Sequence, residues 1–167
     1  ADADVRRAEL EKMFAENKGD INAAMELADL YKRLNLEQQF QGLTMSILND
    51  TNLPPNFYLA VAKIYSDAKR MDLLGYALER YLARDPSNPR VWLDLAAVNA
   101  ALQHTNECIQ ALRKAVEIGG DQIRDAVRQD RRFDSMRGDP NFRALVPQLD
   151  ASLPINMPQN LPIIPGI

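Results

Sequence analysis

This chain of 167 residues lacks the residues around which enzymes and metal sites are usually built. It has one cysteine, which cannot form an internal disulfide, and one histidine, so a zinc site of the common type is not predicted. It contains no glycine-rich phosphate-binding motif and no nucleophile motif of the hydrolase type. No run approaches the roughly 20 apolar residues that a membrane-spanning helix requires. We therefore expect no catalysis, no metal or cofactor, and no direct membrane insertion.

An excess of charge of one sign is also missing. The 20 lysines and arginines and the 23 aspartates and glutamates give a net charge of −3. Residues 113–143 contain eight basic and six acidic side chains, which is a mixed surface rather than a basic stripe. We therefore expect no nucleic-acid partner. The 46% of hydrophobic and 26% of charged residues are typical of a globular domain.

The sequence does contain a regular internal repeat. Equal rows that start at Ile21, Pro55 and Pro89 align small and large apolar residues in separate columns. The small-residue column consists of alanine in all three rows. The columns one position before it and two positions after it consist of large aliphatic residues. These columns are Ala28, Ala62 and Ala96; Leu27, Val61 and Leu95; and Leu30, Ile64 and Val98. Alanine at the same place in each row lets two helices approach closely.

Each row predicts two helices joined by a turn. In the first row, Leu27, Leu30, Tyr31 and Leu34 share one helical face, and the second half of each row shows the same kind of spacing. No stretch alternates β-branched and polar residues, so no sheet is predicted.

Residues that start and end helices agree with these boundaries. Pro55 and Pro89 suit the first position of a helix, where the missing N–H group has no helical partner. Asn88 and Thr105 are predicted N-caps. The pair at 119–120 consists of glycines, which can end a helix in a left-handed turn.

The third row resembles the tetratricopeptide repeat, a helix-turn-helix unit. The residues that carry the resemblance are Trp92, Leu95, Ala96, Cys108, Leu112 and Ala115, together with the Asp85-Pro86 that precedes the row. The first row departs most, with Ala24 in place of the aromatic residue, Thr44 in place of a large apolar one and Asn52 in place of the terminal proline. The resemblance implies an all-α fold, a right-handed superhelix of such repeats with N- and C-terminal capping helices.

The resemblance also divides the chain. Residues 1–150 form the helical repeat domain, with repeats at about 21–54, 55–88 and 89–122, and residues 121–150 form the C-terminal cap. That cap resembles an ending common in bacterial tetratricopeptide proteins, in which Asp139 would cap a short helix that starts at Pro140. Phe133, Met136 and Phe142 stand in the matching places of that ending, and Phe142, Leu145 and Val146 would cover the last repeat.

A further helix is predicted near the N-terminus. Residues 4–16 place Leu10, Met13 and Phe14 on one face, and they read either as a cap or as the second helix of a further repeat.

In tetratricopeptide proteins the first helix of each repeat lines a concave groove that binds partners. The resemblance therefore implies partner-binding positions in each row, polar and mixed in charge in the first two rows and mostly small and apolar in the third. They are Asn22, Met25, Asp29, Lys32 and Arg33; Asn56, Leu59, Lys63, Ser66 and Asp67; and Arg90, Leu93, Ala97, Ala100 and Ala101.

The family's clamp for C-terminal carboxylates is not predicted here. Met25, Asp29, Ala60 and Asp94 stand where that clamp has asparagine or basic residues, and Arg90 alone resembles it. The remaining prediction is a non-catalytic protein-interaction scaffold whose concave groove binds an extended peptide or partner protein. The alternative is a structural role as the soluble domain of a larger protein, including one anchored in a membrane.

Two single residues outside the groove bear on possible chemistry. His104 lies in a predicted turn, where a polar surface role is expected. Cys108 occupies the small-residue column of the second helix, which predicts a buried packing residue rather than a reactive thiol.

Residues 151–167 form a proline-rich apolar tail. Residues 153–167 carry no charge, and Leu153-Pro154-Ile155 recurs as Leu161-Pro162-Ile163. Because proline-rich segments lose little backbone freedom on docking, we expect this tail to pack on an apolar surface of the same protein or of a neighbouring copy, which would form a homo-oligomer. The concave side of the second and third repeats is the first candidate, and the C-terminal cap is the alternative.

Overall fold

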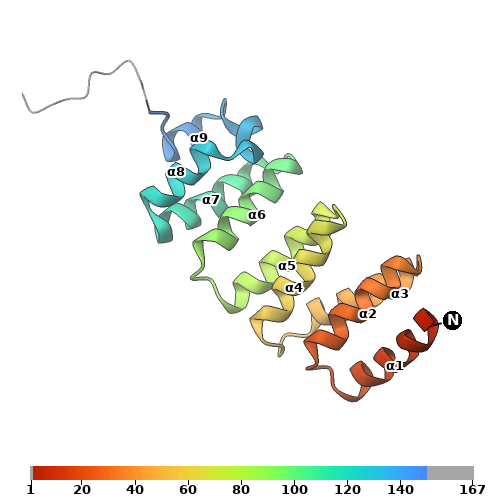
Figure 1. The fold of residues 1–167 in the computed structure, drawn as a ribbon. Coiled ribbons are helices and arrows are strands. Elements are labelled where there is room, and N and C mark those ends of the chain that lie inside the picture. The colour runs from red at the N-terminus through yellow and green to blue at the C-terminus, as the bar shows by residue number, and fades with distance from the viewer. Residues whose placement is uncertain (1, 150–167) are drawn as a thin grey trace, which may run out of the picture.

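The computed structural model describes residues 2–149, and the predictions made for the tail at 151–167 lie outside these residues. Helices follow one another from α1 at one end to α9 at the other, with no strand among the described residues (Figure 1). The helices are α1 (Asp2–Glu16), α2 (Ile21–Arg33), α3 (Glu37–Asn49), α4 (Pro55–Asp67), α5 (Met71–Arg84), α6 (Pro89–Ala101), α7 (Thr105–Gly119), α8 (Asp121–Gln129), the 3₁₀-helix η1 (Arg131–Met136) and α9 (Pro140–Leu145).

The helices pack as a right-handed superhelix of helix-turn-helix repeats, which confirms the predicted fold class. The first helices α2, α4 and α6 start at positions 21, 55 and 89, and the second helices α3, α5 and α7 start at positions 37, 71 and 105. Both series therefore advance by the same step as the rows of the sequence. Each first helix contacts the second helix of its own pair and the second helix of the pair before it.

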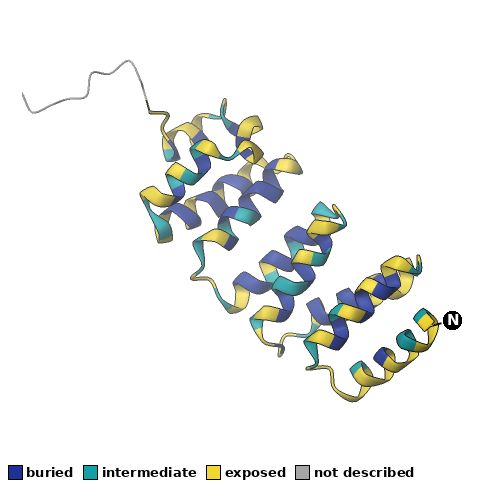
Figure 2. Ribbon diagram, viewed as in Figure 1, coloured by how far each residue is buried: buried dark blue, intermediate teal, exposed yellow. Residues whose placement is uncertain are grey.

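The alanine column lies where helices meet, as predicted. Ala28 and Ala96 are fully buried and Ala62 is 4% exposed. The large aliphatic residue before each alanine is also buried, so one continuous core runs through the described repeats (Figure 2). Because neighbouring repeats share this core, each one depends on the next for burial of its apolar face.

The N-terminal helix has the register of a second helix. Position 3, near the start of α1, lies one full repeat before the start of α3, and α1 packs on α2 as α3 packs on α4. Leu10 is fully buried and Phe14 is partly buried against the core, as predicted. The prediction for Met13 was wrong, because its side chain is 41% exposed.

Most of the predicted helix boundaries are confirmed. The Asn88 side chain accepts a hydrogen bond from the N–H of Arg90 at 3.0 Å, and Asp139 accepts from Asn141 and Phe142 at 2.8 and 3.0 Å. Gly120 follows α7 with φ +61° and ψ −141°, a conformation that glycine adopts without strain. The prediction for Thr105 was wrong, because this residue is already inside α7 and no side chain caps that helix.

The C-terminal elements cover the third repeat. Phe133, Met136, Phe142 and Val146 are buried, α9 contacts α7, and both α8 and η1 contact α6. As a result α6 is enclosed by α5, α7, α8 and η1.

Candidate functional site

The predicted groove positions on α2 and α4 face solvent. In the first repeat Met25 is partly buried against the core, and the other four positions are exposed. In the second repeat Leu59 is partly buried, and the other four are exposed. Asp29 and Arg33 are paired with each other at 2.9 Å across one helical turn. These two helices therefore present a polar surface with two apolar points, which a partner can reach.

The third repeat differs from the prediction. Leu93, Ala97 and Ala100 are only 3%, 5% and 4% exposed, because α8 and η1 pack on α6 beside the helices of the repeat stack. The expected open surface of small side chains on α6 is therefore part of the core. Of the five predicted positions in this repeat, Arg90 and Ala101 remain exposed.

A groove of about 290 Å³ lies between α4 and α6, the first helices of two successive repeats. Its apolar lining comes from α4, α5 and α6, and its polar lining comes from α4, α6 and η1. The apolar residues are Leu59, Ala62, Leu74, Leu78 and Val98, and the polar residues are Lys63, Ser66, Asp94 and Arg132. Three of the predicted positions, Leu59, Lys63 and Ser66, thus lie together in one groove.

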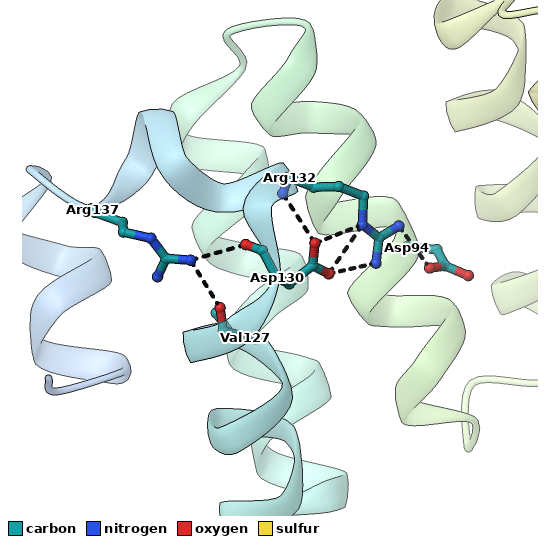
Figure 3. Close-up of polar contacts among 5 residues, drawn as sticks. All are labelled: Asp94, Val127, Asp130, Arg132 and Arg137. Atoms are coloured by element: carbon teal, nitrogen blue, oxygen red, sulfur yellow. Dashed lines mark hydrogen bonds and ion pairs between the residues drawn. The ribbon is translucent and has the colours of Figure 1, made fainter. Parts of the chain in front are cut away.

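Arg132 is the residue of η1 that lines this groove. Its guanidinium group lies between two carboxylates, donating to Asp130 at 2.8–3.1 Å and to Asp94 at 3.0 Å (Figure 3). The hydrogen bonds from Arg132 lower the pKa of Asp130, and the same contact raises the pKa of Arg132. Both partners therefore stay charged near neutral pH, and the Arg132–Asp94 pair is one of the contacts between η1 and α6.

A second arginine attaches the same segment to α8. The Nη2 atom of Arg137 donates to the backbone carbonyls of Val127 and Asp130 at 3.3 and 2.9 Å (Figure 3). These carbonyls lie at the end of α8, where the last turn of a helix leaves acceptors without helical partners. The contact therefore joins the end of η1 to the end of α8.

Neither Cys108 nor His104 belongs to a reactive arrangement among the described residues. Cys108 is fully buried, as predicted, and burial raises the pKa of its thiol to about 11. His104 is exposed in the turn before α7. Within residues 2–149, no three histidine, cysteine, aspartate or glutamate side chains are grouped in a way that could hold a metal ion. None of the helices described in this range is long and apolar enough to cross a membrane.

Sequence reasoning considered Asp94 only as a departure from the carboxylate clamp, and it missed Arg132. The prediction placed positions 93, 97 and 100 of α6 in the groove by analogy with 59, 63 and 66 of α4, but the groove lies between the two helices. The groove therefore contacts the face of α6 that carries Asp94 and Val98, each of which lies one position after a predicted residue. Arg132 lies 38 residues beyond Asp94, and no sequence signal connects the two.

Two solved structures are similar to this fold, and both are crystal structures of MamA, a helical repeat protein. One has a TM-score of 0.51 and 14% sequence identity over 81% of this chain and 74% of the other. The second has a TM-score of 0.51 and 13% identity over 78% of this chain and 76% of the other. No family model matches the sequence, and no curated protein matches it. At this identity the likeness concerns the fold, a tetratricopeptide-like helical repeat.

Proposed function

We propose that this chain is a divergent member of the tetratricopeptide repeat family and a non-catalytic scaffold for protein interaction. Its ligand would be an extended peptide, or an extended segment of a partner protein, bound along the exposed faces of α2 and α4 and in the groove between α4 and α6. The fold is of a type that typically serves as a scaffold, and the regular advance of the helix starts supports the family assignment.

The observation that carries this proposal is the groove between α4 and α6. Small-ligand and peptide sites are typically concave, with an apolar floor and a few polar groups that fix orientation. This groove has Leu74 and Leu78 of α5 among its apolar lining and Lys63, Ser66 and Asp94 among its polar groups. An apolar side chain of a bound peptide would enter the groove, while its backbone would meet the polar groups of α4 and α6.

Selection from a displayed library of random short peptides tests the proposal. We expect the purified protein to enrich peptides that lose binding when Ser66→Arg fills the groove or Lys63→Glu reverses the charge at its edge. Both residues are exposed, so these substitutions leave the core unchanged.

Lys12→Glu is the matched control for Lys63→Glu. Lys12 is 78% exposed on α1, and the same charge reversal there should leave binding intact. Failure to enrich any peptide, or enriched peptides that bind the two groove variants as well as the original protein, would overturn the proposal.

A further inference from the structure

Trp92 is less buried than the residues that share its place in the other repeats. Ala24 and Tyr58, which hold the same place in the first and second repeats, are fully buried, whereas Trp92 on α6 is half-buried. Its Nε1 atom donates a hydrogen bond to the carbonyl of Pro86 at 2.8 Å, which fixes the orientation of the indole ring. The rest of the ring can therefore contact a ligand without losing this bond.

Two adjoining hollows open beside the indole ring, with volumes of about 510 and 260 Å³. Both are lined by Glu79, Trp92 and Leu95. The larger one lies between the second helices α5 and α7, and the smaller one lies between α5 and α6. Ala83 of α5 and Ala111 of α7 leave room because their side chains are short. We call these two hollows together the Trp92 groove.

The second repeat shows why this groove exists in the third. There, the guanidinium group of Arg80 lies over the ring of Tyr58 at 5.8 Å from its centre, and its Nε atom donates to the carbonyl of Leu48 at 2.7 Å. The residue that holds the place of Arg80 in the third repeat is Lys114, which is paired with Glu117 at 3.7 Å. In the third repeat, the cationic side chain at this position is therefore in an ion pair with a carboxylate of the same helix, α7.

The chemistry of the groove favours an uncharged, apolar ligand. Its floor consists of Trp92, Leu95 and Ala111, while its rim carries both signs of charge, with Glu79 and Glu107 against Arg113 and Lys114. A charged peptide would gain little from such a mixed rim, whereas proline rings pack well against the accessible part of an indole ring. Aromatic-lined grooves bind proline-rich segments in this way.

We propose that residues 153–167 of the same chain dock in the Trp92 groove. This segment is free of charge, and it contains four prolines and two copies of Leu-Pro-Ile, at 153–155 and 161–163. The concave side of the second and third repeats was the site first expected for it, but in the third repeat that side is covered by α8 and η1. The groove lies on the side of the second helices, away from the proposed peptide groove between α4 and α6, so the two proposals stand independently.

The length of the segment allows this contact. The described chain ends at Leu149, just after α9, which packs on α7. The 15 residues of α7 span about 22 Å at about 1.5 Å each. An extended proline-rich chain advances about 3.1 Å per residue, so the residues from 150 to 162 can span about 37 Å. The second Leu-Pro-Ile copy can therefore reach the Trp92 groove.

Fluorescence of Trp92 in the full chain tests the proposal directly, because this is the one tryptophan in the sequence. Substitution of Leu153→Asp together with Leu161→Asp should expel the segment from the apolar floor. We expect the emission maximum to move to longer wavelength and quenching by acrylamide to become stronger. Addition of a synthetic peptide with the sequence of residues 153–167 should reverse both changes.

The control is Asn156→Asp with Asn160→Asp, which places the same two charges in the segment outside the Leu-Pro-Ile copies. It should leave emission and quenching close to those of the original protein. Unchanged fluorescence in the leucine variant, or an equal change in the asparagine variant, would overturn the proposal. The emission maximum of the original protein should not depend on protein concentration. A shift on dilution would show that the segment docks on a neighbouring copy, and it would overturn docking within one chain.

Discussion

Thr44 occupies a position in the first repeat where the tetratricopeptide repeat typically has a large apolar residue. Both Thr44 and Tyr65 are fully buried, and the Tyr65 hydroxyl donates to Thr44 Oγ1 at 2.6 Å. Thr44 in turn donates to the backbone carbonyl of Phe40 at 3.0 Å. Each buried hydroxyl therefore has a partner, and the pair joins α3 of the first repeat to α4 of the second. A leucine at position 44 would leave the Tyr65 hydroxyl without an acceptor there.

Thr44→Val tests this pair at the scale of one residue. Removal of the acceptor should lower the free energy of unfolding by about 1–3 kcal/mol, because the buried Tyr65 hydroxyl loses its partner. Tyr65→Phe removes the hydroxyl itself and should cost less. Urea unfolding of both single variants and the double variant measures the coupling. Strictly additive losses would show that the two side chains do not interact.

Each first helix ends in the same left-handed turn. Asn35, Lys69 and Gln103 have φ values of 57°, 56° and 61°, and they hold the same place in successive repeats. After each of them the next N–H group donates back to the helix, as Leu36 does to Tyr31 at 2.8 Å and His104 does to Asn99 at 2.9 Å. This is the Schellman motif, in which glycine is the usual residue.

Gln103→Gly tests this turn at the scale of the element. A side chain in the left-handed region costs about 1–2 kcal/mol, and glycine removes this strain. Glycine also makes the unfolded chain more flexible, and this offsets part of the gain. We expect a net gain in stability of up to about 1 kcal/mol. The control is Gln110→Gly in the exposed interior of α7, which should instead destabilise by about 1 kcal/mol. Thermal unfolding distinguishes the two, and a loss of stability in both variants would contradict the interpretation.

The whole molecule is closed at one end by its own C-terminal elements. Phe133 of η1 is fully buried, and its ring lies 6.1 Å from that of Phe142, measured between centres. By contrast, the Arg132–Asp94 ion pair is about half exposed, at 49% and 51% of the two side chains. Burial of Phe133 should therefore hold η1 on α6 far more strongly than the ion pair does.

The single variants Phe133→Ala and Arg132→Ala test which of the two contacts contributes more to stability. The first should cost about 3–5 kcal/mol, because it leaves a cavity in the core. The second should cost less than about 1 kcal/mol, because an exposed ion pair contributes little. Loss of Phe133 should also uncover the apolar side chains of α6 and increase binding of a hydrophobic dye. Similar losses from both substitutions would contradict this account.

Much of the fold followed from local patterns. The alanine column, the prolines at 55 and 89 and the caps at Asn88 and Asp139 each act within one helix or one pair of helices, so the sequence shows them directly. The candidate site followed less well. Leu59, Lys63 and Ser66 were placed by the repeat register, but burial of Leu93, Ala97 and Ala100 depends on a segment that lies well beyond the third repeat's first helix, at α8 and η1.

The sequence by itself determined the repeat unit, since a regular period of small and large apolar residues lets successive helix pairs bury their apolar faces only by stacking. Which surface stays open was decided by the tertiary structure alone. The packing of η1 on α6 covers the first helix of the third repeat. It also places Arg132 in the groove between α4 and α6, which Lys63 and Asp94 line as well. Such contacts join distant parts of the chain through shape and burial, which leave no periodic trace in the sequence.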